Sequence, residues 1–288
     1  MKLNMRNSIA AIAMPALLLT YHACKKDDNN SNPYTPPSQN TTSVQLASTA
    51  KFGSILTDSA GRTLYFFAID ANGNSGCTGG CVAAWPVFYK AQPTLAAGLN
   101  AADFSTITRT DGTPQTTYKG WPLYYYASDP KAGDINGDGV GGTWFVAKPD
   151  YSIMLASQQL TGLDGIQYTS EHVPGQEVTQ YFTDAYGRTL YTFSPDKFKK
   201  NNFTKADFSN DPVWPMDTLS SIKNVPSLLD KTQFDTLLVF GRVQLTYKGW
   251  PLYYFGKDSA TRGNTRGVSF PQPGVWPIAR KDITIAPM

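Results

Sequence analysis

The stretch Tyr118-Lys119-Gly120-Trp121-Pro122-Leu123-Tyr124-Tyr125 decides the fold, because it returns unchanged as Tyr247-Lys248-Gly249-Trp250-Pro251-Leu252-Tyr253-Tyr254. Upstream, residues 57–65 and 183–191 match each other in the same register. The six tryptophans also pair one to one: Trp85 with Trp214, Trp121 with Trp250, and Trp144 with Trp276. These matches indicate an internal duplication, with one β repeat domain expected at residues 44–157 and a second at residues 158–288.

A shorter pattern, Gly-x-x-Leu-Tyr-x-(Phe/Tyr)-x-x-Asp, occurs four times and starts at Gly61, Gly120, Gly187 and Gly249. Each copy predicts a turn glycine, then a strand, then an aspartate at the next turn. Apolar side chains fall on both faces of the strand, which is typical of strands that are covered on both sides. The tyrosine and aspartate of the four copies are Tyr65 and Asp70, Tyr124 and Asp129, Tyr191 and Asp196, and Tyr253 and Asp258.

The composition favours an all-β protein. Of the 22 acidic residues 20 are aspartate, a turn and cap residue, and the chain also holds 24 Gly and 20 Pro. We therefore predict antiparallel β modules, arranged as two sandwich-like or barrel-like domains or as one body of four propeller-like units. Strands are expected at residues 54–58, 63–68, 105–109, 115–118, 122–127 and 143–147, and short helical turns at 97–104 and 220–230.

The N-terminus predicts export. Residues 1–23 carry the positive charges of Lys2 and Arg6 and then a short apolar run, whereas a membrane span needs about 20 apolar residues. The run ends at Cys24, so the segment resembles a lipoprotein signal peptide with Cys24 as the lipidated residue. Tyr21 departs from the leucine usual at that position, and ordinary cleavage or a retained anchor are the alternatives. Residues 24–43 are polar and predict a disordered tether.

The location expected from these signals is the cell envelope, with a lipid anchor in the outer membrane. The Lys-Lys-Asp-Asp run at residues 25–28 is similar to signals that carry lipoproteins to the cell surface, so surface exposure is a further expectation. Without Lys2 and Arg6 the chain has 23 basic and 22 acidic residues. Such a balance offers no basic stripe for a phosphate backbone, and nucleic acid is not expected as a partner.

Cys77 and Cys81 are the two cysteines left after Cys24, and an even pair in an exported chain predicts a disulfide. A redox-active pair or half of a soft-metal site are the alternatives. Three residues separate the cysteines, whereas reactive pairs usually have two between them. A structural disulfide is therefore preferred.

One stretch has the spacing of a calcium loop. Asp134, Asn136 and Asp138 alternate with other residues and precede Gly139, so their oxygen atoms are candidate Ca²⁺ ligands. The twelfth position holds Phe145 instead of the bidentate glutamate of that loop. A turn rich in glycine and aspartate without a metal is the preferred alternative, and calcium is the one cofactor that the sequence suggests.

No catalytic residue is assigned from the sequence. His172 is the only histidine beyond the signal segment, which argues against a histidine-dependent triad or a multi-histidine metal centre. The paired acids of a glycoside hydrolase are an alternative interpretation of the four motif aspartates, but four equivalent copies favour turns or strand ends. Arg62 and Arg188 are expected to stack on aromatic rings or to pair with nearby aspartates.

These motifs resemble a family of secreted bacterial lipoprotein repeats of unknown function, described by Tyr-x-(Phe/Trp/Tyr)-x-x-Asp. The flanking cysteine pair with Trp85, and residues 133–142 with Trp144, match it as well. The second half departs from the family, because Ala206 and Asn210 stand where the first half has its cysteines. The resemblance implies export and repeats and brings no catalytic residues.

We therefore expect a membrane-tethered extracytoplasmic lipoprotein that acts as a binding or scaffold module of the cell envelope. An envelope glycan or protein is the expected partner, and the specific ligand stays open. An enzyme acting on envelope glycan and an extracytoplasmic redox protein are the alternatives.

Overall fold

The repeated Tyr-Lys-Gly-Trp stretch forms the same tight turn in both halves. In the computed structural model, which describes residues 43–288, Lys119 and Gly120 have φ angles of 49° and 77°. Lys248 and Gly249 have φ angles of 49° and 82°. Two successive positive φ angles characterise a type I′ turn, whose twist suits an antiparallel hairpin. The turns join β5 (Pro114–Tyr118) to β6 (Trp121–Pro122), and β12 (Arg242–Tyr247) to β13 (Trp250–Pro251).

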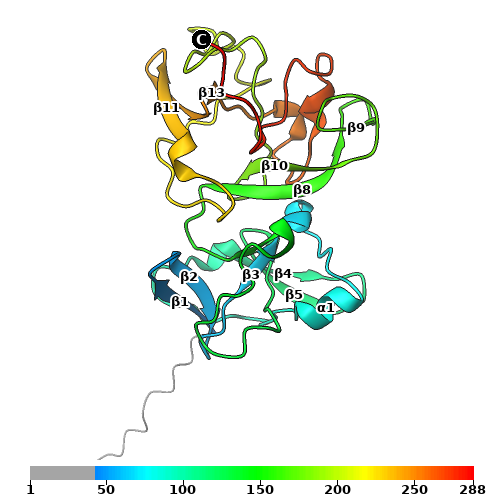
Figure 1. Ribbon diagram of the computed structural model, residues 1–288, viewed down its shortest axis with the longest axis vertical. Helices are drawn as coiled ribbons and strands as arrows, with labels where there is room; N and C mark the ends of the chain where they lie inside the picture. The colour runs from blue at the N-terminus through cyan, green and yellow to red at the C-terminus, as the bar shows by residue number, and fades with distance from the viewer. Residues whose placement is uncertain (1–42) are drawn as a thin grey trace, which may run out of the picture. The chain divides into compact units, whose positions relative to one another are not determined.

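The strands of the first half lie in three small antiparallel sheets (Figure 1). The first sheet is the hairpin of β1 (Val44–Thr49) and β2 (Gly53–Asp58), the second pairs β3 (Tyr65–Phe67) with β7 (Trp144–Val146), and the third orders β4 (Phe104–Thr108), β5 and β6.

The second half repeats this plan with longer strands. One sheet has the order β10 (Val178–Asp184), β8 (Ile153–Thr161) and β9 (Gln167–Tyr168), and the other has the order β11 (Phe234–Val239), β12 and β13. The pair β8–β10 corresponds to β1–β2. Asp184 at the end of β10 lies opposite Ile153 at the start of β8, as Asp58 at the end of β2 lies opposite Val44 at the start of β1. In place of a β3–β7 sheet, Tyr191 makes bridges to Tyr253 and Ile278.

Helical structure in residues 43–288 is limited to short turns, and none of these helices has the length and apolar character needed to cross a membrane. The helices are α1 (Gly80–Ala84), η1 (Ala68–Asn72), η2 (Ala101–Asp103), η3 (Val140–Gly142), η4 (Lys231–Gln233), η5 (Gly256–Asp258) and η6 (Arg266–Ser269). The turn expected within residues 97–104 is confirmed by η2. The turn expected at 220–230 is wrong, because that segment has no helix and η4 follows it.

The structure confirms a duplicated, antiparallel all-β protein, and its five small sheets do not close into a barrel within residues 43–288. The strand expected at residues 122–127 is wrong beyond Pro122. The segment keeps a single bridge to a strand, between Tyr124 and Tyr65 of β3. Beyond it the backbone bonds to loops: the Tyr125 amide donates to the Pro86 carbonyl at 2.7 Å, and the Ala127 amide donates to the Ala84 carbonyl at 2.8 Å.

Two tryptophans of each half stack on each other in the core. Trp85 stacks on Trp144 with ring centroids 3.8 Å apart, and Trp214 stacks on Trp276 at 3.7 Å. All four rings are buried. The matching stacks show that the two halves pack in the same way, with large indole rings filling a core between short strands.

The two halves also share buried apolar side chains, since one hydrophobic cluster contains Phe66 and Trp121 together with Leu190 and Tyr253. Strand β8 runs through residue 157, where the boundary between two domains was expected. That division stays a prediction. The signal peptide, Cys24 and the tether as far as residue 42 lie outside the described residues.

Candidate functional site

The tyrosines and aspartates of the repeat motif form reciprocal pairs between two copies. In the first half the Tyr65 hydroxyl donates to Asp129 Oδ2 at 2.6 Å, and the Tyr124 hydroxyl donates to Asp70 Oδ2 at 2.6 Å. The backbones of the two tyrosines also exchange hydrogen bonds, of 2.8 and 2.9 Å. Each copy therefore supplies the carboxylate that satisfies the buried hydroxyl of the other copy.

The second half repeats the exchange. The Tyr191 hydroxyl donates to Asp258 Oδ2 at 2.7 Å, and the Tyr253 hydroxyl donates to Asp196 Oδ2 at 2.7 Å. The Oδ1 atom of each motif aspartate accepts a backbone amide from the loop that follows. These amides belong to Gly76, Asn136, Asn202 and Arg266, at 2.7 to 2.9 Å.

Burial is the main cause of the altered acidity of Asp70, Asp196 and Asp258. It raises the pKa of Asp70 and of Asp258 to about 7, and that of Asp196 to about 6, although the tyrosine and amide hydrogen bonds act in the opposite direction. Both oxygens of each motif aspartate already accept a hydrogen bond. The geometry therefore gives the motif a role in joining the copies and capping the next loop.

The predicted disulfide between Cys77 and Cys81 is present. It closes the start of helix α1, and Arg109 Nη2 donates to the Cys77 carbonyl at 2.7 Å. In the second half Asn210 takes the place of Cys81. Its carbonyl accepts the Trp214 amide at 3.1 Å, as the Cys81 carbonyl accepts the Trp85 amide at 2.8 Å.

Hydrogen bonds replace the disulfide in the second half. Asn210 Oδ1 accepts the Lys205 amide at 3.1 Å, and Asn210 Nδ2 donates to the Phe203 carbonyl at 3.3 Å. One loop is thus closed covalently and its counterpart by an amide side chain, which supports a structural role for the cysteine pair.

The calcium candidates bond to the backbone of their own loop and its neighbours. Asp134 Oδ2 accepts the Lys131 amide at 2.9 Å, Asn136 Nδ2 donates to the Ser128 carbonyl at 3.1 Å, and Asp138 Oδ1 accepts the Val146 amide at 3.1 Å. Within residues 43–288 no three His, Cys, Asp or Glu side chains form a cluster suited to a metal ion. Calcium binding stays a prediction from sequence.

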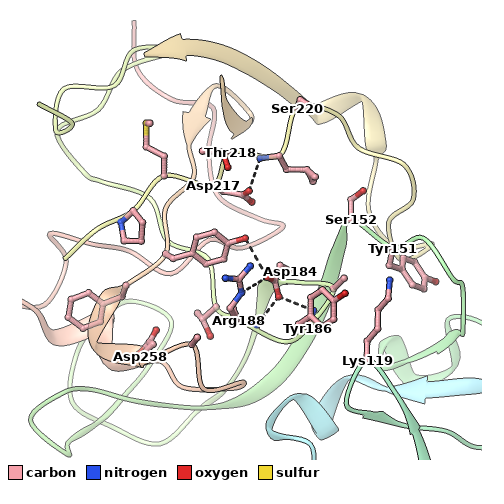
Figure 2. A pocket seen from close by; sticks show the side chains of 18 of the residues that line it. Lys119, Tyr151, Ser152, Asp184, Tyr186, Arg188, Asp217, Thr218, Ser220 and Asp258 are labelled. Atoms are coloured by element: carbon pink, nitrogen blue, oxygen red, sulfur yellow. Dashed lines mark hydrogen bonds and ion pairs between the residues drawn. The ribbon is translucent and has the colours of Figure 1, made fainter. Parts of the chain in front are cut away.

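A cleft of about 1000 Å³ opens in the second half and carries chemistry that the motif pairs do not use. Its lining includes the turn after β10, the segment after Trp214 and, from the first half, Lys119 and residues 149–152. Figure 2 shows Asp184 and Arg188 close together in this cleft, with Asp217 nearby and Tyr186 beside Asp184.

The turn after β10 positions a compact cluster of charged and aromatic groups. Asp184 Oδ1 accepts the amides of Tyr186 and Arg188 at 2.9 and 3.0 Å, which fixes the turn. Asp184 Oδ2 accepts Arg188 Nε at 2.6 Å and the Tyr254 hydroxyl at 3.4 Å. The guanidinium group lies 4.5 Å from the centre of the Tyr254 ring, so Arg188 both stacks and pairs, as expected.

The first half contains a counterpart of this cluster. Asp58 Oδ1 accepts the amides of Ala60 and Arg62 at 2.9 Å each, and the Tyr125 hydroxyl donates to Asp58 Oδ2 at 2.9 Å. The Arg62 guanidinium lies 3.9 Å from the Tyr125 ring centre. The stacking expected for Arg62 is therefore confirmed.

The two clusters differ at one buried position. Asp217 in the second half occupies the backbone position of Phe88 in the first, three residues after the paired tryptophan. Asp217 is only 4% exposed, and burial raises the pKa of its carboxyl group to about 6, with Asp184 adding to the effect and Arg188 opposing it. A buried carboxyl group of altered pKa in a cleft marks a candidate functional site.

Sequence reasoning missed Asp217, although a signal was present. Aligning the paired tryptophans sets Trp85-Pro86-Val87-Phe88 against Trp214-Pro215-Met216-Asp217, so an acidic residue stands where its counterpart is aromatic. The motifs that stand out in the sequence are the ones that the two halves share, whereas Asp217 is a difference between the halves.

Comparison with known families agrees with the repeated architecture. The profile of a family described as a secreted repeat of unknown function matches residues 47–89, 105–148 and 240–280. Three segments of the chain thus match a repeat that the family description calls secreted. The match confirms the resemblance drawn from the motifs, and the three matched segments leave out residues 149–239, where Asp184, Arg188 and Asp217 lie. No curated protein and no solved structure matches the chain.

Proposed function

We propose that this secreted repeat protein is a binding module of the cell envelope, anchored by a lipid on Cys24 to the outer membrane, and that the cleft of its second half holds the ligand. The tether of residues 24–43 would keep the cleft within reach of envelope components on the order of 25 Å from the membrane.

The observation that carries the proposal is the set of groups left free in the cleft. The Arg188 side chain is 43% exposed, and no residue within 43–288 accepts a hydrogen bond from its Nη atoms. Asp217 contributes a buried carboxyl group, and the Tyr186 ring is 52% exposed beside them. A concave site with a few convergent polar groups and an aromatic surface is typical of ligand binding.

The test is a ligand screen by thermal shift, followed by isothermal titration calorimetry, on a soluble form that begins at Asn40. Residues 40–288 form one compact unit, so this form keeps the cleft. We expect at least one soluble envelope fragment to raise the melting temperature of this form but not that of an Arg188→Ala variant. If no envelope fragment binds, or if the variant binds all ligands equally well, the proposed site is wrong.

A second candidate function is hydrolysis of an envelope glycan. It is favoured by one observation, that two carboxyl groups, Asp184 and Asp217, line the same cleft and that burial raises the pKa of Asp217 to about 6. A carboxyl group of raised pKa can act as a general acid beside an ionised carboxylate. Incubation of the soluble form with envelope glycans should then release reducing ends, and an Asp217→Asn variant should release none. Binding without product would favour the first candidate.

A further inference from the structure

We infer that the cleft takes a neutral glycan and that Asp217 determines this specificity, so that each chain has one such site, in its second half. This inference rests on the proposed binding function and adds the ligand class and the residue that selects it. It depends on the comparison of two nearly identical frameworks within a single chain.

The framework around Asp217 is the same as that around Phe88. The Phe88 amide donates to the Leu123 carbonyl and its carbonyl accepts the Thr116 amide, both at 3.0 Å. The Asp217 amide donates to the Leu252 carbonyl at 2.9 Å, and its carbonyl accepts the Leu245 amide at 2.8 Å. The side chain has therefore changed while the backbone has not.

The replacement works against stability. Phe88 is fully buried and packs edge-on against Tyr125, with ring centroids 5.7 Å apart. Asp217 gives up such a contact and places a carboxyl group in a poorly solvated position, which is unfavourable unless partners compensate. Its Oδ1 accepts the Leu219 amide at 3.0 Å, but no residue within 43–288 donates a hydrogen bond to its Oδ2. Oδ2 is therefore an acceptor without a protein partner on a largely buried side chain that lines the cleft, where a ligand can supply the donor.

The remaining groups define the ligand chemistry. The Nη atoms of Arg188 are free donors, Asp217 Oδ2 is a free acceptor, and the Tyr186 ring offers a flat apolar face. Neighbouring hydroxyl groups of a sugar both donate and accept, and the C–H face of a pyranose ring packs on an aromatic ring. A sugar satisfies all three groups at once.

Charge argues for a neutral glycan. The cleft is lined by four aspartates and three cationic side chains, and one of these cations, Arg188, is already paired with Asp184. A phosphate or an acidic sugar would meet the Asp184 and Asp217 carboxyl groups without enough free cations to offset them. The counterpart cluster in the first half lacks the acceptor, because Phe88 fills its position.

The experiment is isothermal titration calorimetry with the soluble form that begins at Asn40. The probes are neutral oligosaccharides, namely chitotetraose, mannotetraose and maltotetraose, together with tetragalacturonate and inorganic phosphate as acidic probes. We expect binding of a neutral probe at one site per chain. Asp217→Phe should weaken it by roughly tenfold or more, since the charged acceptor is lost.

Two variants keep the test independent of folding. Asp217→Asn retains the size of the side chain and should also weaken binding, and Arg62→Ala, in the cluster that lacks the acceptor, should leave affinity unchanged. Thermal melts establish that each variant is folded; we expect Asp217→Phe to fold because Phe88 already occupies the same framework.

Equal affinity of the wild type and both Asp217 variants, or two sites per chain, would overturn the inference and leave the proposed binding function in place. A preference for the acidic probes would overturn the ligand class. Failure of the wild type to bind any envelope fragment in the broader screen removes the proposed function and the inference together.

Discussion

Tyr253→Phe is the sharpest test of the reciprocal tyrosine–aspartate pairs. The substitution removes only the hydroxyl that donates to Asp196 Oδ2 at 2.7 Å, and both side chains are fully buried. A hydrogen bond to a charged group contributes about 1.5–3 kcal/mol, and one between neutral groups about 1 kcal/mol. We therefore expect a loss of about 2 kcal/mol at pH 8, where Asp196 is ionised, and about 1 kcal/mol at pH 5.

The pH dependence follows from the sign of the pKa shift. Burial raises the pKa of Asp196 from 3.8 to about 6, so the folded protein retains a proton that the unfolded chain releases. Its contribution to stability is complete below about pH 4 and falls as the pH rises through 6. Without the Tyr253 hydroxyl, which lowers this pKa, the fall should be larger and extend to higher pH.

The assay is urea unfolding, followed by tryptophan fluorescence at pH 5 and pH 8, with the disulfide intact. Tyr126→Phe is the matched control, because the Tyr126 hydroxyl makes no hydrogen bond with a residue in 43–288 while its ring packs against Trp85. Equal losses in the two variants, or a loss for Tyr253→Phe that is greater at pH 5 than at pH 8, would refute the reasoning.

Three further predictions concern other features. Replacing Cys77 and Cys81 together by serine should lower the free energy of unfolding by about 2 kcal/mol and leave ligand binding intact, as urea unfolding and calorimetry would reveal; lost binding with a retained fold would contradict a structural disulfide. Gly120→Ala should lower the melting temperature of the protein more than Gly53→Ala. Both glycines have positive φ, but a Cβ at residue 120 would lie 1.7 Å from Arg262 Nη1, whereas residue 53 faces open space. Equal changes in melting temperature would rule out crowding by Arg262. Cys24→Ser should move the protein from the membrane fraction to the soluble fraction and abolish labelling by a palmitate analogue, and unchanged fractionation would exclude lipid anchoring at this residue.

Much of the fold was predictable, because the sequence repeats itself and the repeats carry turn chemistry. The Lys-Gly pairs at 119–120 and 248–249 form the hairpin turns. Trp85 stacks on Trp144 in the first half as Trp214 stacks on Trp276 in the second. What could not be predicted is the partner of each buried polar group. Alternation along a strand tells which face a tyrosine occupies, but the exchange of Tyr65 with Asp129 joins residues 64 positions apart.

The strand expected at 122–127 failed for a related reason. The Tyr-rich segment has the composition of a strand, yet a strand needs a neighbouring strand of similar length. Here β3 pairs with the segment at Tyr124 alone, and the next residue bonds to the loop around Pro86. The candidate site was missed because Asp217 is informative only when set against Phe88. Aligning the halves and searching for polar replacements of apolar residues would have found it.

The exchange of hydroxyl and carboxylate between copies has a consequence for how such proteins lengthen. A solitary copy would bury a tyrosine hydroxyl and an aspartate that each lack their counterpart, and either omission is unfavourable in a dry interior. Duplication of two copies together avoids this cost, because the two copies satisfy each other's buried hydroxyl and carboxyl groups. It also allows one pair of copies to differ from the other at single positions, as Asp217 differs from Phe88, while both keep the same backbone framework.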